Sequence, residues 1–333
     1  MYNSILLITN KTSCMKKVSN FLVVLGVASL MTMPSCKKIL DELGNSAGNN
    51  PGISANVKLI EYKNSDHRLM GGYFSRETGD TAGILNLIPD SVDIINIWGR
   101  QENSADWEQE LQIIHDLQKN KGMKFIVTGW LDDLNSRFGP KDASGAVNNK
   151  NWRTGVTALR DSVIKWKLDG IDFDIEPGII PESNDSLVAI MTELAKYFGP
   201  TSTPPTLSNA KLMFIWDTNM DGNFAPYTKT YKNYDLVYLQ AYWRNANSLT
   251  NTYNTFKNYI PQSKFLAGVD FEDETGFASN QMPAYAAWAT SQNMGGVFSY
   301  KIERDYANQS GSFSSYAITR AAIQTMNPAK KNK

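Results

Sequence analysis

An alternation of apolar and acidic residues between Leu168 and Pro177 constrains the fold of this chain more than any other stretch of its 333 residues. The alternation has a period of two, which is typical of a β-strand and not of a helix. Carboxylates therefore line one face of the strand, and they belong to Asp172, Asp174 and Glu176. Carboxylates at this density repel one another and lose hydration when they are buried. A solvated acidic strand face is the simple alternative, but the flanking sequence favours a functional site.

Short apolar runs alternate with longer helical patterns from residue 66 onward. The predicted strands are Leu69–Phe74, Val92–Trp98, Lys124–Trp130, Gly170–Glu176, Lys211–Trp216, Leu236–Ala241, Phe265–Asp270 and Gly296–Tyr300. The predicted helices are Asp106–Asn120, Trp152–Lys167, Ser186–Tyr197, Leu249–Tyr259, Pro283–Asn293 and Tyr316–Met326. Eight strands that alternate with helices over about 260 residues predict an α/β fold, a single-domain (β/α)₈ barrel. A doubly wound open sheet is the alternative, although no Gly-rich phosphate-binding fingerprint follows any strand.

Aromatic, acidic and amide side chains lie where the predicted strands end. In a (β/α)₈ barrel these ends meet on one rim, and the chemistry of the fold is placed there. Aromatic faces stack on the C–H faces of sugars, and carboxylates bind sugar hydroxyls, so we predict a carbohydrate groove. One aromatic residue alone is more often part of a core, and the groove is therefore inferred from the whole set. The candidate substrate-binding residues are Tyr73, Trp98, Trp130, Trp216, Trp243, Asp270 and Tyr300.

A positively charged and then apolar segment near the N-terminus is typical of a secretion signal. It begins at Met15 before two lysines, and its apolar run, Phe21–Met33, is too short for a membrane span. The run ends just before Cys36, and the segment resembles a bacterial lipoprotein signal in which this cysteine becomes the lipidated first residue. We therefore expect residues 1–36 to be a leader and the protein to be exported and lipid-anchored at the outer membrane or cell surface. A plain secretory signal that is cleaved elsewhere is the alternative.

The segment after the leader is predicted to be a flexible tether over residues 37–65, because Gly44–Gly52 is rich in Asn, Gly and Ser. The barrel domain is then expected over residues 66–328. Cys14 and Cys36 are the only cysteines of the chain, so the body has none for a disulfide.

Charge and metal-ligand patterns exclude several functions. The 33 basic and 33 acidic residues give a net charge of zero, so nucleic acid is not expected as a partner. The two histidines, His67 and His115, are far apart in the sequence and no Cys/His cluster is present, so a metal site is not expected. No cofactor is predicted, and nothing in the sequence indicates an oligomeric state.

The acidic strand carries a family resemblance. Its sequence from Asp169 to Glu176 resembles the DGxDxDxE signature of glycoside hydrolase family 18, which that family places on its fourth barrel strand. The run is also the fourth predicted strand here. The resemblance implies a (β/α)₈ glycosidase without a cofactor and extends over residues 66–326.

Two further segments favour the endo-β-N-acetylglucosaminidase branch of that family, the Endo F/H-like branch, over the chitinase branch. Gln240–Tyr242 is similar to its sixth strand, and Trp243 follows where chitinases commonly have aspartate. Ser299 and Tyr300 stand where chitinases commonly carry tryptophan. Met70–Phe74 resembles the first strand of the same branch more loosely.

The spacing of the acids bears on the mechanism. Residues two apart on a strand face the same side and lie about 7 Å apart. Asp174 and Glu176 therefore approach a sugar from one direction, and neither can attack the anomeric carbon from the opposite face. The family resemblance implies that the 2-acetamido carbonyl of the substrate attacks instead and forms an oxazolinium intermediate.

Roles for five residues follow from that chemistry. Glu176 would protonate the leaving oxygen and then activate water, helped by neighbouring carboxylates that raise its pKa. Asp174 would orient the acetamide N–H and balance the positive charge of the oxazolinium. Tyr242 and Gln240 would hold the acetamide in place. Asp172 lies deeper and would partner Asp174.

The leading hypothesis is an endo-acting hydrolase that cleaves the β-1,4 bond in the N,N′-diacetylchitobiose core of N-linked glycans. The partner is thus an N-linked glycan or another N-acetylglucosamine-containing oligosaccharide. A chitinase or chitodextrinase with the same mechanism is the second hypothesis. The third is a surface glycan-binding lipoprotein without activity, although the presence of Glu176, Asp174 and Tyr242 favours an enzyme.

Overall fold

The computed structural model describes residues 51–75, 81–99, 102, 105–134, 152–178, 183–203, 211–272, 281–307 and 316–329. All described residues belong to one compact unit, Pro51–Lys333. The predicted leader and its candidate lipidation residue, Cys36, therefore lie outside the described residues.

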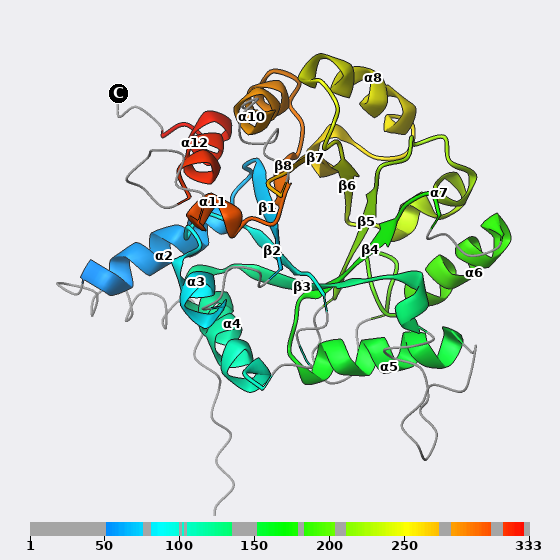
Figure 1. The fold of residues 1–333 in the computed structure, drawn as a ribbon, viewed down its shortest axis with the longest axis horizontal. Helices are drawn as coiled ribbons and strands as arrows, with labels where there is room; N and C mark the ends of the chain where they lie inside the picture. Colours follow the sequence, from blue (N-terminus) through cyan, green and yellow to red (C-terminus); the bar gives the residue numbers. More distant parts are fainter. Residues whose placement is uncertain are drawn as a thin grey trace, which may run out of the picture. The chain divides into compact units, whose positions relative to one another are not determined.

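Eight parallel strands close into a barrel in which each strand pairs with its sequence neighbours and β8 pairs with β1 (Figure 1). The strands are β1 (Leu69–Phe74), β2 (Ile94–Ile97), β3 (Lys124–Gly129), β4 (Gly170–Ile175), β5 (Met213–Thr218), β6 (Leu236–Gln240), β7 (Phe265–Asp270) and β8 (Gly296–Tyr300). This closure confirms the predicted (β/α)₈ barrel and excludes the open doubly wound sheet. The acidic run is the fourth strand, as the sequence predicts.

Helices form a ring outside the strands (Figure 1). The α-helices are α2 (Pro51–Lys63), α3 (Thr81–Leu87), α4 (Trp107–Lys121), α5 (Trp152–Lys165), α6 (Asn184–Leu194), α7 (Ala225–Thr230), α8 (Ala246–Phe256), α10 (Gln281–Ser291), α11 (Arg304–Ala307) and α12 (Ala317–Met326). Short 3₁₀ turns are η2 (Leu131–Leu134), η3 (Tyr231–Asn233) and η4 (Gln262–Lys264). Within the described part of the chain, no helix is long and apolar enough to cross a bilayer.

Helix α2 corrects the predicted tether, which was expected to extend to residue 65. Its last residue, Lys63, bonds through Nζ to Asp93 Oδ1 at 3.0 Å, just before β2 begins. Tyr62 accepts a hydrogen bond from Asn327 Nδ2 at 3.1 Å, just after α12. These contacts attach α2 to the N-terminal side of the barrel, so the prediction of a flexible segment was wrong for residues 51–63. Composition alone cannot show that a polar helix has partners far along the chain.

Two apolar layers enclose the strands. The inner layer, inside the barrel, contains Tyr73, Ile94, Ile126, Ile215, Leu236, Tyr238, Leu266 and Phe298. The outer layer lies between strands and helices, and β4 contributes Ile171, Phe173 and Ile175 to it. The side chains of β4 thus alternate as predicted, with the apolar residues outward and the aspartates inward.

Packing of the inner layer requires a close contact between the β1 backbone at Gly71 and the side chain of Tyr238. A Cβ at Gly71 would lie 2.6 Å from the hydroxyl oxygen of Tyr238, so no larger residue fits there beside that ring. Tyr238 stacks on Phe298 with ring centroids 4.4 Å apart. The barrel is therefore filled by aromatic rings below the acidic residues, and its interior is a packed core and not a pore.

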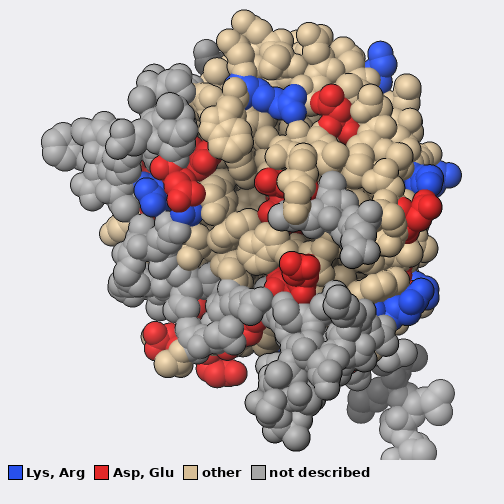
Figure 2. Space-filling view, turned by 45° about the vertical axis from the view of Figure 1, so that its right-hand side comes forward, with Lys and Arg blue, Asp and Glu red and all other residues tan. Residues whose placement is uncertain are grey.

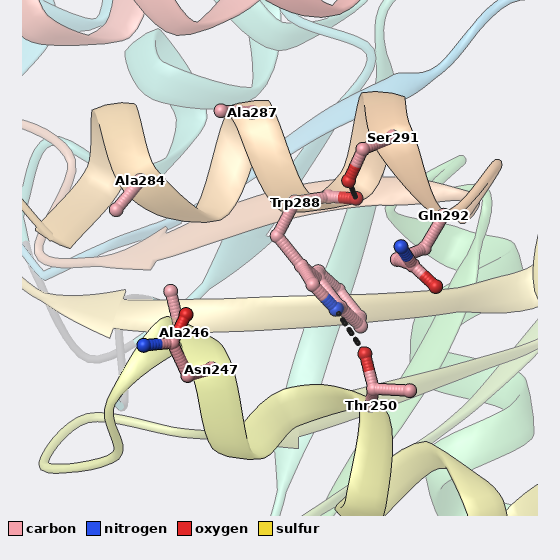
Figure 3. Close-up of a pocket in the computed structure, with 8 residues that line it drawn as sticks. All are labelled: Ala246, Asn247, Thr250, Ala284, Ala287, Trp288, Ser291 and Gln292. Atoms are coloured by element: carbon pink, nitrogen blue, oxygen red, sulfur yellow. Dashed lines mark hydrogen bonds between the residues drawn. The ribbon is translucent and has the colours of Figure 1, made fainter.

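Helices α8 and α10 leave a groove on the outside of the barrel (Figure 3). Its lining residues are uncharged and comprise Ala246, Asn247, Thr250, Ala284, Ala287, Trp288, Ser291 and Gln292. Trp288 donates its indole N–H to Thr250 Oγ1 at 3.0 Å, which ties the two helices together. This tryptophan belongs to the helix layer and is separate from the strand ends.

Candidate active site

Strand β4 places three acids along one line into the barrel mouth. Asp172 is fully buried, Asp174 is 5% exposed, and Glu176 lies half-buried just beyond the end of the strand. The neighbouring strands bring Thr128 beside Asp172 and Asp217 beside Asp174. The acids therefore descend from the rim to the core, and only Glu176 reaches the surface of the site.

Glu176 and Asp174 share a hydrogen bond, which favours the protonated form of Glu176 and the ionised form of Asp174. Burial and the charge of Asp174 together raise the pKa of Glu176 to about 6. Burial also raises the pKa of Asp174, although its hydrogen-bond donors oppose this. A carboxyl group whose pKa is raised toward 6, next to a partner whose ionised form is favoured, is suited to be a general acid at mildly acidic pH.

Asp174 is held by two donors from neighbouring strands. Trp130, at the end of β3, donates its indole N–H to Asp174 Oδ2 at 3.1 Å. Gln240, at the end of β6, donates from Nε2 to Asp174 Oδ1 at 2.8 Å. Each carboxylate oxygen of Asp174 thus has its own fixed donor, and the plane of the carboxylate is defined.

Asp172 lies below Asp174 and is supported by Tyr73, whose hydroxyl donates to Asp172 Oδ2. Burial raises the pKa of Asp172, whereas Thr128, Tyr73 and Asn96 favour its charged form. Tyr73 is 1% exposed, so its predicted contact with substrate was wrong. It supports the acids from beneath, because its ring packs in the inner layer against Tyr238 and Phe298.

Gln240 also lies deeper than predicted. It is 4% exposed, and its Nε2 donates both to Asp174 and to Asp217 Oδ2, the latter at 2.8 Å. Its amide is thus part of the floor of the site. Gln240 also lies close enough to Glu176 to lower the pKa of that carboxyl group.

Tyr242 lies at the mouth, half-buried, with its ring stacked on Tyr300 at 6.0 Å between centroids. Burial raises its pKa well above the usual value, and nearby carboxylates, first Asp217 and then Asp174, add to this. Its phenol therefore stays neutral and can donate a hydrogen bond. The structure brings Tyr242 together with Asp174 and Glu176, as the sequence predicts.

Aromatic rings form one wall of the mouth. Trp98 lies at the centre of the wall, with its ring centroid 4.6 Å from Trp130, 5.2 Å from Tyr300 and 5.7 Å from Tyr73. Trp243 follows Tyr242 and is 72% exposed, so its indole is free to stack against a ligand. Of the predicted substrate-binding residues, Trp98, Trp130, Tyr300 and Trp243 therefore lie at the strand ends near the acids.

The last two predicted substrate-binding residues differ in position: Trp216 packs among the helices, whereas Asp270 lies at the strand ends, near enough to Tyr242 to raise its pKa. Trp216 is 1% exposed and packs in the outer layer against Tyr227 and Tyr234, with ring centroids 5.4 and 5.0 Å away, so the prediction that it lines the groove was wrong. The cause is the position of β5, which runs to Thr218 and turns Trp216 outward and Asp217 inward. Asp270 is 8% exposed and accepts the backbone N–H of Glu272 at 2.7 Å.

Asp217 is a residue of the site to which the sequence analysis assigned no role. Both faces of β5 carry apolar residues, Met213 and Ile215 on one and Phe214 and Trp216 on the other, so the alternation does not reveal which face meets the helices. The signal that could have identified Asp217 is its own charge, because a carboxylate is poorly placed in an apolar helix layer. Among the described residues, no group of His, Cys, Asp and Glu could hold a metal ion.

Figure 2 shows Asp and Glu side chains near the centre of the face drawn and also at its edges, where Lys and Arg side chains lie beside them. Within the part of the chain that the structure describes, the groups that favour the charged forms of Asp172, Asp174 and Asp217 are hydrogen-bond donors.

Comparison with known proteins agrees with this geometry. The sequence model of the family described as endo-β-N-acetylglucosaminidase EndoS TIM-barrel domain matches residues 73–299. The chain is 33% identical over 299 residues to endo-β-N-acetylglucosaminidase F2 of Elizabethkingia meningoseptica, covering 81% of this chain and 85% of that protein. A barrel with these acids and these relatives defines a glycosidase. The chain belongs to the endo-β-N-acetylglucosaminidase family described by the EndoS TIM-barrel domain.

Solved structures extend the comparison. An endo-β-N-acetylglucosaminidase variant from Cordyceps militaris, in complex with fucosyl-N-acetylglucosamine-Asn, is 26% identical with a TM-score of 0.67, covering 82% of this chain and 96% of that one. A chitinase from Bacteroides thetaiotaomicron is 13% identical with a TM-score of 0.57, covering 80% and 99%. The second likeness shows a shared fold alone.

Proposed function

We propose that this protein hydrolyses the β-1,4 bond in the N,N′-diacetylchitobiose core of N-linked glycans, with retention and with the substrate acetamide as nucleophile. The observation that carries this proposal is the pair Asp174 and Glu176, which share a hydrogen bond on one side of the mouth. The names of the relatives support an endo-β-N-acetylglucosaminidase substrate. In the Cordyceps variant an aspartate and a glutamate two residues apart are replaced by their amides, the spacing of this pair.

Glu176 acts first as an acid and then as a base. Its raised pKa, about 6, keeps a share of the proton available at mildly acidic pH for the leaving oxygen. Once the leaving sugar has departed, the ionised carboxylate removes a proton from the attacking water. Its half-buried position at the strand end lets it reach both groups.

Asp174 acts on the acetamide. Trp130 and Gln240 fix its two oxygens, so its ionised carboxylate can accept the acetamide N–H and balance the positive charge of the oxazolinium. Tyr242, whose phenol stays neutral, donates to the acetamide oxygen and holds it toward the anomeric carbon. Because both acids lie on the same strand face, neither can attack the anomeric carbon from the opposite side, and the substrate acetamide acts as the nucleophile instead.

The aromatic wall binds the sugars on either side of the scissile bond. Trp98, Trp130 and Tyr300 present ring faces and edges at the mouth, and the exposed indole of Trp243 offers a further platform. Asp270, beside Tyr300 in the β7–β8 register, is suited to accept a sugar hydroxyl.

The test is hydrolysis of a high-mannose glycoprotein of the ribonuclease B type by the wild type and by Glu176→Gln, with products weighed by mass spectrometry. We expect a single N-acetylglucosamine to remain on the protein. Turnover of the Gln variant should fall about 100- to 10,000-fold, while glycan binding stays within a few-fold. Unchanged turnover of the variant would reject Glu176 as the acid.

The same experiment separates the alternatives. Cleavage of chitin oligosaccharides without cleavage of the glycoprotein would identify a chitinase. Glycan binding by the wild type without products would identify an inactive glycan-binding protein.

We also propose that the protein is exported and lipid-anchored through Cys36. The support is the order of the charged segment, the apolar run and the cysteine near the N-terminus. Metabolic labelling with a radioactive fatty acid should mark the wild type and not Cys36→Ala. Label on both proteins, or on neither, would reject this anchor.

A further inference from the structure

Asp217 lies on β5 directly beside Asp174 on β4, and the reaction proposed above leaves it without a role. It is 1% exposed. Neighbouring strands are about 4.8 Å apart, so the two carboxyl groups are close in a medium where two negative charges repel strongly. A second buried acid at this position lowers the stability of the barrel, so its presence calls for a functional explanation.

A proton on one member of this pair removes the repulsion between the two carboxylates. Burial raises the pKa of Asp217 well above its usual value, and the charges of Asp174 and Asp172 raise it further. Asp174 is the ionised member because it has two donors and the Glu176 proton beside it. Asp217 therefore sits next to it as a neutral acid, which carries one hydrogen-bond acceptor and one donor.

Gln240 connects the two acids. The amide nitrogen of Gln240 has two hydrogens, and it donates at 2.8 Å to Asp174 Oδ1 and at 2.8 Å to Asp217 Oδ2. Its carbonyl oxygen is buried and has no hydrogen-bond partner among the described residues. Donated hydrogen bonds therefore hold this amide, and one of them ends on Asp217.

We propose that Asp217 is a positioning residue of the reaction and that it acts through Gln240. By accepting one amide hydrogen, Asp217 directs the other at Asp174 and keeps the Asp174 carboxylate in the plane that faces the acetamide. The inference rests on the proposed function, because it assigns the purpose of this geometry to acetamide-assisted hydrolysis. A purely structural acid would occupy the same space but would have no effect that depends on Gln240.

The experiment compares Asp217→Asn and Asp217→Leu, each alone and together with Gln240→Met. An asparagine has the acceptor and donor of a neutral acid, so kcat should stay within about threefold of wild type. Leucine fills the volume without an acceptor, and kcat should fall about 10- to 100-fold with KM nearly unchanged, as expected for a misplaced catalytic group. In the Gln240→Met background, the leucine substitution should cause no further loss.

A matched control is Thr218→Val, the next residue on β5, which is 1% exposed and donates to the carbonyl of Ile175 at 2.6 Å. This change removes a buried hydrogen bond on the helix side and should leave kcat unchanged. If the leucine variant does not fold, Asp217→Ala takes its place in the same cycle. Thermal unfolding of every variant separates lost activity from lost structure.

Three outcomes would overturn the proposal: wild-type kcat in the leucine variant, an asparagine variant as impaired as the leucine variant, or losses that multiply with Gln240→Met. Affinity for a thiazoline mimic of the oxazolinium, measured by calorimetry on the same variants, gives a second readout that needs no turnover. It should weaken in parallel with kcat. A wild type that binds this mimic but does not cleave glycoprotein contradicts the proposed substrate alone, and one that does neither overturns both inferences.

Discussion

At the scale of single residues, the site depends on where each proton resides. Asp174 and Glu176 lie two positions apart along the chain, yet their shared hydrogen bond favours the ionised form of the first and the protonated form of the second. Indole and amide donors stabilise the ionised member, and solvent reaches the protonated one. The strand geometry sets the spacing, but the neighbouring strands assign the roles.

The pH dependence of the reaction should report Glu176. Its pKa is raised to about 6, so the protonated acid is lost as the pH rises through that value. We expect kcat/KM to fall on the alkaline side with an apparent pKa near 6, measured on a soluble chitobiose-core glycopeptide. An aryl glycoside whose leaving group needs no proton should show a much weaker alkaline fall. A limb near 4.5 for both substrates would contradict the assignment.

Trp130 should contribute through its indole N–H and not only through its ring. Trp130→Phe keeps an aromatic face but removes the donor to Asp174 Oδ2. We expect kcat to fall about tenfold, the usual loss for a hydrogen bond to a charged group. The control is Trp288→Phe in the outer groove, which also loses an indole bond, to Thr250 (Figure 3). Equal kcat values for the two variants would show that the indole of Trp130 has no part in catalysis.

At the scale of the elements, the sequence predicted the strands, which recur as short apolar runs. It did not predict features that depend on contacts with residues far along the chain. The boundaries of β1, β7 and β8 were predicted correctly, because each is a short apolar run between turns. Strand β5 begins and ends two residues later than expected, so Trp216 lies within the strand, where it faces the helices, and Asp217 faces inward. Helix α2 was missed because its stability comes from contacts with residues before β2 and after α12.

The attachment of α2 should depend on Asp93. This buried carboxylate accepts from Lys63 Nζ and pairs with His67 Nε2, both at 3.0 Å, and accepts the Met70 N–H at 2.8 Å. Asp93→Asn leaves Lys63 without its charge partner, so the free energy of unfolding in urea should fall by about 3 kcal/mol. The control Asp90→Asn breaks the exposed pair with Lys121 and should change it by less than about 1 kcal/mol. A similar small change in both variants would mean that Asp93 does not secure the helix.

At the scale of the whole barrel, the inner and outer sides of the strands have different functions. The outer sides are apolar and bind the helices, and this pattern made the eight-strand closure predictable. The inner sides carry aromatic rings below and acids above, so the mouth is set at the carboxyl ends of the strands. Which acids meet there was not predictable in full, because contacts across β4, β5 and β6 depend on register.

Occupancy of the mouth should stabilise the whole domain. A thiazoline mimic at about 100 times its dissociation constant should add about 2.7 kcal/mol to the free energy of unfolding, provided that it binds only the folded state. Urea unfolding with and without the mimic measures this, and free N-acetylglucosamine at the same concentration is the control. A midpoint that does not move at any attainable concentration would count against an acetamide-shaped site.

The cluster of buried acids also links folding to the solvent. The pKa values of Asp172 and Asp217 are raised by burial above those of an exposed chain. In mildly acidic solution an unfolded molecule holds these groups ionised, so the chain must take up protons as the barrel closes. Refolding would then make a weakly buffered solution more alkaline, and the heat released on refolding would depend on the ionisation enthalpy of the buffer.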